Sequence, residues 1–259
     1  MFLKSSKQFL IVGSFFYVTF SNCFFDNNLT KVITQKPLNF LGAATLNDVE
    51  APSIKVLGAA TGTNIKADAI KVAGSVFFKD VIAHQLDVAG SAKLEEGSIN
   101  LFNGSGSTTL KKMTITRALI AGACEILFSK IHSIEVKGTA SIDNSQIETD
   151  CVLFSDATIT DTTIGGSIIV EPTYSCDSQE NITIGGITIN HVRSINVNGG
   201  VVRINGQVAP LSSVEQIITL NSATHVKGDI TFKSGKGKVY KGREALVTGK
   251  IIGAEVFNQ

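Results

Sequence analysis

Oxygen-bearing side chains recur with a 16-residue period in the first half of the chain, at Asp48, Asn64, Asp80 and Glu96. If the chain coils with that period, these side chains stack, and carboxylates about 5 Å apart repel each other unless a cation lies between them. Calcium prefers carboxylate oxygens, so Asp48, Asp80 and Glu96 are candidate calcium ligands. We favour a solvated ladder of turn residues, because Asn and Asp favour turns, Asn64 interrupts the acids and no calcium-loop spacing is present.

Histidines stand one such period away from acidic residues at two places. Asp68 precedes His84 by one period, and His132 precedes Glu148 by one period. A histidine and a carboxylate on neighbouring coils could share a proton or a metal ion. Two ligands are too few for a metal site, so we expect exposed corner residues and no bound metal.

The stretch from residue 141 to residue 180 holds eight acidic residues and no Lys or Arg. Asp143, Asp150, Asp156 and Asp161 invite comparison with polysaccharide-cleaving β-helices, whose carboxylates act as acid and base in a groove. However, the chain has no Trp and only three Tyr, so platforms on which a sugar could stack are scarce. A nucleophile motif, a phosphate-binding loop and a zinc pattern are also missing from the sequence. We therefore predict a protein that is not an enzyme and has no cofactor.

A 16-residue repeat must position these side chains. Its most regular member is glycine, always followed by a small residue: Gly42, Gly58, Gly74, Gly90, Gly106, Gly122 and Gly138. We write the sequence in rows of 16 residues that start at Leu41. Apolar residues fill the sixth, fourteenth and sixteenth positions of these rows, and polar residues lie between them, as in Ile134-Glu135-Val136. Alternation with a period of two predicts short, half-buried strands.

Each row is too short for a β-α-β unit, yet it must return to the same place for glycine to stack on glycine. The sequence therefore predicts an all-β protein, a single-stranded parallel β-solenoid with about 16 residues per coil and three short faces. Glycine would form a corner where φ is positive or the backbones approach closely. We expect a right-handed coil, because left-handed hexapeptide solenoids have about 18 residues per coil and a six-residue internal repeat.

The rows set the expected boundaries. Regular coils are predicted for residues 41–152 and looser coils for residues 153–256, with residues 24–40 as a cap or linker before them. Residues 171–180 are the best candidate for a protruding loop. Ile99, Ile131 and Ile147 at the eleventh position replace apolar residues at the ninth position of earlier rows, which suggests that the register slides.

Residues 1–23 have the form of an export signal, because two lysines precede an apolar run from Gln8 to Phe20. Phe20-Ser21-Asn22-Cys23 resembles the box before a lipid-modified cysteine in bacterial lipoproteins, although Phe20 and Asn22 depart from the usual residues. Cys23 is therefore a lipidation candidate, and an ordinary cleavage site is the alternative. We predict export to the periplasm, the outer-membrane surface or the extracellular space, with a lipid anchor as the only link to a membrane.

Three cysteines follow the signal, and they have no metal-type spacing. Cys151 and Cys176 are the better candidates for a disulfide, because Cys124 falls in a core-facing column of the repeat. Without residues 1–23, the 23 basic and 22 acidic residues become 21 and 22, which argues against nucleic acid as the main partner.

Rows such as Ile70-Lys71-Val72-Ala73-Gly74-Ser75 and Ile134-Glu135-Val136-Lys137-Gly138-Thr139 resemble two groups of bacterial proteins. One group is the bactofilins, which are filament-forming scaffolds. The other is the exported β-helix proteins of the adhesin-like head-domain type, which the export segment favours because bactofilins are usually cytosolic. The resemblance covers about residues 41–152 and implies a rod-like adhesin or envelope scaffold. Its partner is an unknown protein or cell surface, and we expect a monomer or small oligomer. A bactofilin-like polymer is the alternative, and a polysaccharide-active enzyme is a weaker one.

Overall fold

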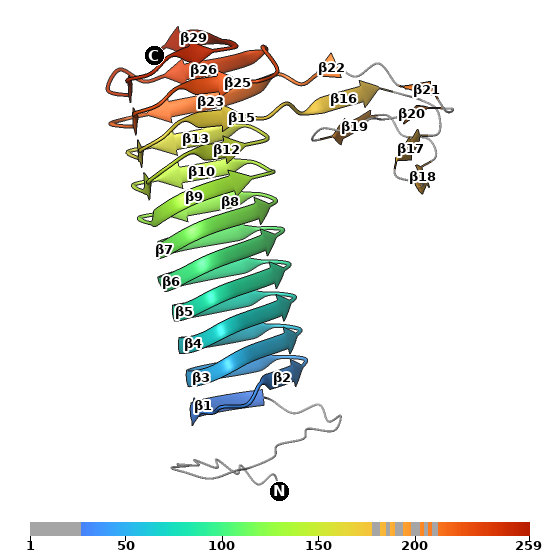
Figure 1. Ribbon diagram of the computed structural model, residues 1–259, viewed down its shortest axis with the longest axis vertical. Coiled ribbons are helices and arrows are strands. Elements are labelled where there is room, and N and C mark those ends of the chain that lie inside the picture. Colours follow the sequence, from blue (N-terminus) through green and yellow to red (C-terminus); the bar gives the residue numbers. More distant parts are fainter. Residues whose placement is uncertain are drawn as a thin grey trace, which may run out of the picture.

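The computed structural model describes residues 27–177, 182–184, 187–189, 194–197, 203–204, 207–208 and 212–259. The predicted signal segment and Cys23 lie outside these residues. The described chain folds into 29 β-strands without a helix. Most of the strands form one long stack of coils, with a small group of strands beside its C-terminal part (Figure 1).

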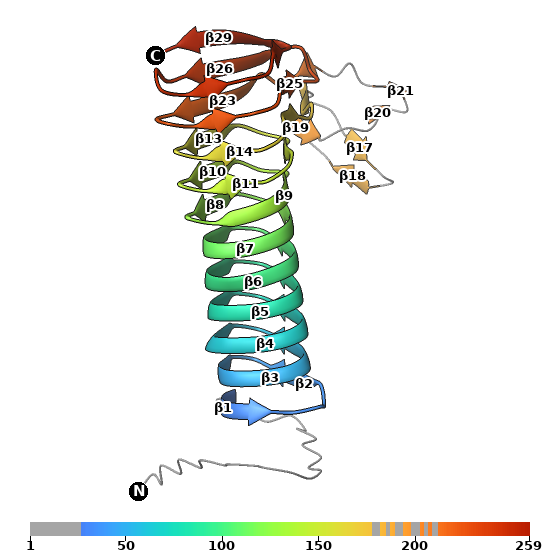
Figure 2. The same ribbon diagram turned by 60° about the vertical axis from the view of Figure 1, so that its left-hand side comes forward.

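The regular coils each consist of one wrapped strand of 14 residues. These strands are β3 (Ala44–Leu57), β4 (Ala60–Ala73), β5 (Val76–Ala89), β6 (Ala92–Ser105) and β7 (Thr108–Ala121). Neighbouring strands pair in parallel with a constant 16-residue shift, as in Ala44 with Ala60 and Ala60 with Val76. In Figure 2 the chain crosses the near face from left to right as it rises toward the C-terminus, so the coil is right-handed. The predicted right-handed, parallel β-solenoid is confirmed.

The cross-section has three short faces around an apolar core. Burial falls on positions 4, 6, 9, 11, 14 and 16 of the rows, as Ala44, Leu46, Val49, Ala51, Ile54 and Val56 illustrate. Neighbouring faces are separated by corners, where consecutive residues point outward. Two of the corners have two such residues, and one has three. We call these corners the Gly corner (positions 1–3), the αL corner (positions 7–8) and the third corner (positions 12–13).

At the Gly corner, glycine is required for two reasons, and Gly74 shows both. Its φ is +141°, a conformation that residues with a side chain rarely adopt. A Cβ on Gly74 would also lie 2.2 Å from the carbonyl oxygen of Gly58 in the preceding coil. The expected role of the repeated glycine is therefore confirmed.

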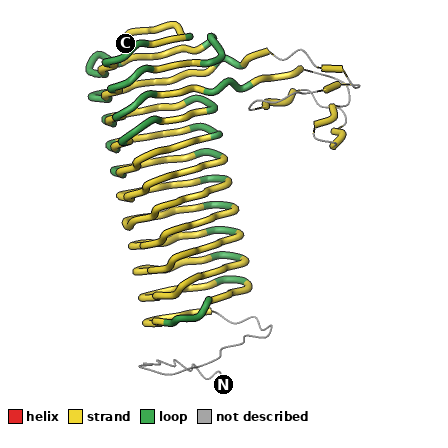
Figure 3. The backbone as a smooth tube through the Cα atoms, viewed as in Figure 1, coloured by secondary structure: helices red, strands yellow, loops and turns green. Residues whose placement is uncertain are grey.

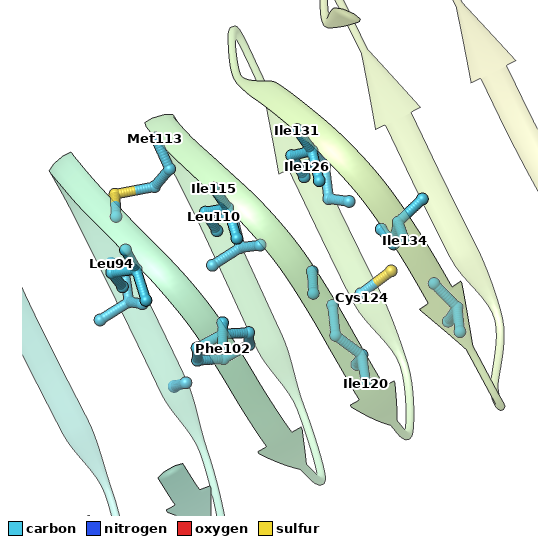
Figure 4. Close-up of a cluster of buried hydrophobic side chains, with 14 of the residues drawn as sticks. Leu94, Phe102, Leu110, Met113, Ile115, Ile120, Cys124, Ile126, Ile131 and Ile134 are labelled. Atoms are coloured by element: carbon cyan, nitrogen blue, oxygen red, sulfur yellow. The ribbon is translucent and has the colours of Figure 1, made fainter. Parts of the chain in front are cut away.

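Core residues compensate one another in volume at fixed register. In one coil the larger Val81 at position 9 goes with the small Ala83 at position 11, and in the next coil the small Gly97 at position 9 goes with the larger Ile99 at position 11. Phe102 likewise stacks on the small Ala118. Figure 4 shows buried side chains of successive coils, among them Leu94, Leu110 and Ile126. The sliding register predicted from the eleventh position is wrong for these coils, since β3 to β7 pair at a constant shift of 16 residues and position 11 is buried in each of them.

After β7 the coils are built from shorter strands. They are β8 (Cys124–Leu127), β9 (Lys130–Val136), β10 (Ala140–Asp143), β11 (Gln146–Ile147), β12 (Cys151–Leu153), β13 (Ala157–Thr160), β14 (Thr163–Ile164) and β15 (Ile168–Val170). Here a column of buried hydroxyls replaces apolar residues at position 9. Ser129 Oγ accepts the backbone N–H of Met113 at 3.0 Å, and Ser145 Oγ accepts that of Ser129 at 3.0 Å. Thr162 continues this hydroxyl ladder.

The 16-residue register ends at the third corner of the coil that contains β11 and β12. Ile147 pairs with Ile131, a shift of 16, but Cys151 pairs with Ile134, a shift of 17. One residue is therefore added between Ile147 and Cys151. Val152 is the sixteenth residue of its row and was therefore expected in the core, but Leu153 occupies the core column instead.

The solenoid begins before the first predicted row. β1 (Asn27–Ile33) pairs in parallel with the first half of β3, and β2 (Leu38–Leu41) pairs with its second half. The described residues from Asn27 to Leu41 thus form a coil of the stack, not the cap or linker predicted for residues 24–40.

The stack resumes after an inserted segment. β13 pairs in parallel with β23 (Gln216–Asn221), so that Ala157 lies beside Ile218. β24 (His225–Val226), β25 (Ile230–Phe232), β26 (Gly237–Lys241), β27 (Leu246–Val247) and β28 (Ile251–Ile252) follow, and β29 (Ala254–Asn258) lies on β26. The coils from β1 to β28 number eleven, and β29 begins a twelfth.

The inserted strands form two small antiparallel sheets beside the stack (Figure 3). They are β16 (Tyr174–Asp177), β17 (Ile182–Ile184), β18 (Ile187–Ile189), β19 (Ser194–Val197), β20 (Arg203–Ile204), β21 (Gln207–Val208) and β22 (Ser212–Ser213). The protrusion was expected at residues 171–180, and it extends to β22. The expectation of looser coils throughout residues 153–256 is wrong for this part, because β17 pairs antiparallel with β18.

Candidate functional site

A groove runs along the stack beside the Gly corner of the regular coils. It has a volume of about 530 Å³ and follows β3 to β9. Its outer surface includes the exposed Leu57 and a row of small residues, Ala73, Ala89 and Ala121. We call it the lateral groove. Because it repeats the same shape in successive coils, it suits an extended partner that lies parallel to the stack.

Charged residues border the lateral groove. Lys71 Nζ lies 3.7 Å from Asp87 Oδ2, and Asp87 Oδ1 accepts a hydrogen bond from Asn103 Nδ2 at 2.7 Å. At the other end Lys137 Nζ lies 3.6 Å from Glu135 Oε1. Lys55 lines the end nearest the N-terminus. The groove thus combines an apolar floor with polar groups that could orient a bound chain.

The candidate calcium ligands lie at the αL corner. Asp48, Asn64, Asp80 and Glu96 all have φ between +52° and +63°, the left-handed conformation that Asn and Asp tolerate best. Asn64 Nδ2 donates to Asp48 Oδ1 at 2.7 Å, and Lys112 Nζ lies 3.2 Å from Glu96 Oε1. Asp48 and Asp80 are separated by a whole coil. Asp80 and Glu96 stand on neighbouring coils, and the solvated ladder of turn residues stays the prediction for this corner.

The predicted histidine pairs lie at the third corner, and one of them forms. His132 Nδ1 lies 3.0 Å from Glu148 Oε2, and Lys130 Nζ lies 2.7 Å from Glu148 Oε1. The hydrogen bonds from Lys130 and then His132 hold the pKa of Glu148 below its ordinary value. His84 contacts Asn100 at 3.0 Å instead of Asp68. Among the described residues, no three or more His, Cys, Asp or Glu side chains gather closely enough to hold a metal ion.

Three carboxylates of the acid-rich stretch lie at three different corners, where each accepts a backbone N–H. Asp150 Oδ1 accepts from Ser167 at 2.8 Å at the third corner. Asp156 Oδ1 accepts from Ile217 at 2.8 Å at the Gly corner, and Asp161 Oδ1 accepts from Ala223 at 3.1 Å at the αL corner. Asp143 lies at the same corner as Asp161, where it accepts from Asn144 Nδ2. Asp150, Asp156 and Asp161 thus each connect one coil to the next, at three different corners.

Cys124 and Cys151 are buried free thiols in the core. Burial raises the pKa of Cys124 to about 12, and it raises the pKa of Cys151 as well. Cys151 stacks between Ile134 and Ile168, so the disulfide predicted with Cys176 is not formed. Cys176 lies in β16, whose side chains are outside the described part. The added residue before Cys151, which turns it inward, could not be located from the rows.

Sequence reasoning also missed an exposed aromatic residue. Phe128 occupies the αL corner with φ of +50° and is 55% exposed. The signal was present in the rows, because Phe128 stands at the eighth position, where earlier rows carry Asp, Asn, Glu or Lys. The other rows have polar residues at this position. The aromatic ring of Phe128 therefore makes the corner between β8 and β9 a candidate binding site.

The parallel coils, their three corners and the apolar core define a β-solenoid protein. No family model, curated protein or solved structure matches the chain. The similarity to exported adhesin-like proteins and to bactofilins therefore stays a prediction from the rows. In the described part of the chain, none of the elements is a helix that could span a membrane.

Proposed function

We propose that the protein is an exported, rod-like structural or interaction protein, an adhesin or an envelope scaffold that binds a protein or cell-surface partner without catalysing a reaction. The observation that supports this most is the lateral groove, which repeats one shape over successive coils of a rigid stack. Solenoid proteins commonly use such extended surfaces for binding.

Localisation is tested on intact cells. Protease treatment of whole cells should remove the protein, and fractionation should recover it from the envelope or the medium. Replacing Cys23 with Ser should move it from the membrane fraction to a soluble fraction if a lipid anchors it. A protein that survives protease treatment and fractionates with the cytosol would contradict the proposal.

The groove is tested separately. Ala89 is exposed on the groove, so Ala89→Lys should obstruct it without disturbing the core. We expect cells that carry this variant to lose binding to a host-cell or envelope preparation that retains the wild type. The control is Thr61→Lys, which places the same charge at an exposed position away from the groove, in the column where Lys93 stands naturally. Equal loss in both variants would argue against the groove.

Self-assembly is the second candidate function. Val256 continues the core column of Val239 but is 44% exposed, and Phe257 beside it is 37% exposed. Such apolar surface favours stacking of a further coil. We expect a monomer or small oligomer, and electron microscopy at low and physiological salt decides between the two candidates. Long, unbranched filaments under both conditions would favour the polymer.

A further inference from the structure

A shallow hollow lies on the outside of the αL corner between β7 and β14. It has a volume of about 380 Å³, and its walls include Lys112, Phe128, Lys130, Asn144, Gln146 and Asp161. We call it the corner hollow. Its volume lies within the range of about 300 to 1,000 Å³ that is usual for small-molecule sites.

Phe128 is the unusual residue of the corner hollow. A φ of +50° is rare for a bulky residue, and the side chain is 55% exposed, so burial does not compensate for this conformation. The next coil has Asn144 at the equivalent position with φ of +46°, which is the kind of residue the corner prefers. Residues held in sparsely populated conformations cluster at binding sites. Phe128 thus presents a ring to solvent at a place where folding favours a polar residue.

The two lysines around the ring carry little free positive charge, because each is paired with an acid. Lys112 is paired with Glu96 at 3.2 Å, and Lys130 is paired with Glu148 at 2.7 Å. One oxygen of Asp161 accepts the backbone N–H of Ala223. Gln146 is exposed and, within the described chain, its carboxamide has no side-chain hydrogen bond. An amide group that can both donate and accept is therefore available beside the ring.

We propose that the corner hollow binds a neutral carbohydrate, with one sugar ring lying against Phe128. The face of an aromatic ring is negative, and it attracts the C–H groups on the face of a sugar. Gln146 and Asn144 supply amides for the sugar hydroxyls. A nucleic acid would need unpaired positive charge, whereas both lysines are paired with acids. The inference rests on the proposed function, because an adhesin exposed at the cell surface meets glycans.

The decisive variant is Phe128→Asn. Asparagine suits the left-handed conformation, so this variant should fold at least as stably as the wild type while it removes the ring. The control is Phe77→Thr. Phe77 is 41% exposed on a flat face, where Lys93 Nζ lies 4.9 Å from its ring, and Thr45 and Thr61 occupy the equivalent position.

Binding is measured on the purified full chain by isothermal titration and saturation-transfer NMR, with cellotriose, maltotriose and chitotriose as probes. We expect at least one sugar to bind the wild type and Phe77→Thr equally, and Phe128→Asn to bind it at least tenfold more weakly with an unchanged or higher Tm. Gln146→Ala should weaken binding severalfold.

The proposal is overturned if none of the three sugars binds the wild type, or if Phe128→Asn binds as well as the wild type. It is also overturned if only an oligothymidylate probe binds, since stacking of bases would then explain the exposed ring. Because these measurements use purified protein, they fail independently of the localisation experiment. A sugar-binding protein found in the cytosol would contradict the proposed function and leave the corner hollow as a carbohydrate site.

Discussion

The coils of β3 to β7 and the coils of β8 to β15 share one cross-section but connect their layers differently. In the first group the backbone of one coil pairs almost continuously with the next, and glycine gives the close approach at one corner. In the second group the strands are short, and side chains accept backbone N–H groups across the corners. The same solenoid can therefore add hydrogen bonds from polar side chains at the corners to the backbone pairing of its strands.

This difference predicts the largest effect for the glycine corner. Gly74→Ala should destabilise the protein by more than about 3 kcal/mol, because the new Cβ would lie 2.2 Å from a backbone oxygen at φ of +141°. Gly235→Ala is the control, since Gly235 also has positive φ, at +70°, but no atom lies within 4 Å of its added Cβ. Urea denaturation measures both. Equal losses would show that the φ angle alone, and not the contact between coils, determines the loss in free energy of unfolding.

The hydroxyl ladder should be the weak element of the second group. Ser145 Oγ accepts the N–H of Ser129 at 3.0 Å and donates to the carbonyl oxygen of Asp143 at 2.8 Å. Ser145→Ala leaves a buried N–H without its acceptor, so we expect a loss of about 1 to 3 kcal/mol and faster hydrogen exchange of the Ser129 amide. Ser141→Ala, at an exposed position, should change neither. An unaltered exchange rate in Ser145→Ala would refute the ladder.

Alkaline pH should weaken the junction between the two groups, where Cys124 is buried. Its pKa rises from 9.0 to about 12 on folding, so the unfolded chain loses this proton first. The contribution of this thiol to stability is therefore constant below pH 9, and it falls by about 1.4 kcal/mol per pH unit as the pH rises toward 12. Cys124→Ala removes the thiol, so it should reduce the slope of the free energy of unfolding against pH. Ala92 and Ala140 show that alanine fits this position. A slope identical to that of the wild type would contradict the expectation.

The smallest effect belongs to the exposed ion pairs. Lys130 and His132 lower the pKa of Glu148, so their contribution is present above the ordinary pKa of a glutamate and is lost as the pH falls through the lowered value. Glu148→Gln should lower Tm slightly at neutral pH, and the two Tm values should converge in acid. Thermal melts across the acidic range test this. A difference that grows in acid would reverse the assigned sign.

The sequence revealed the first group of coils more fully than the second. Glycine at a constant spacing and apolar columns such as Ile54 and Ile70 are sufficient to predict parallel coils, because backbone pairing imposes a fixed length. One added residue before Cys151 broke the columns, and a corner can absorb it without a visible sequence signal. Ser145 and Asp150 have the types of surface residues, so their inward and cross-coil roles could not be recognised. Phe128 was visible as an exception in its column, but its exposure depended on the corner geometry.

The insertion between β15 and β23 leaves the stack at a defined height along its length. Thr158 of β13 still pairs with Thr219 of β23, so the stack closes over the insertion as if no residues intervened. Nine coils precede the departure of the chain, which places that point about 40 Å along the stack at about 4.8 Å per coil. Deleting or duplicating one whole 16-residue coil among β3 to β7 would change this height by one step, while parallel stacking would keep the side from which the insertion leaves. The regular coils thus act as an adjustable spacer for the strands that they carry.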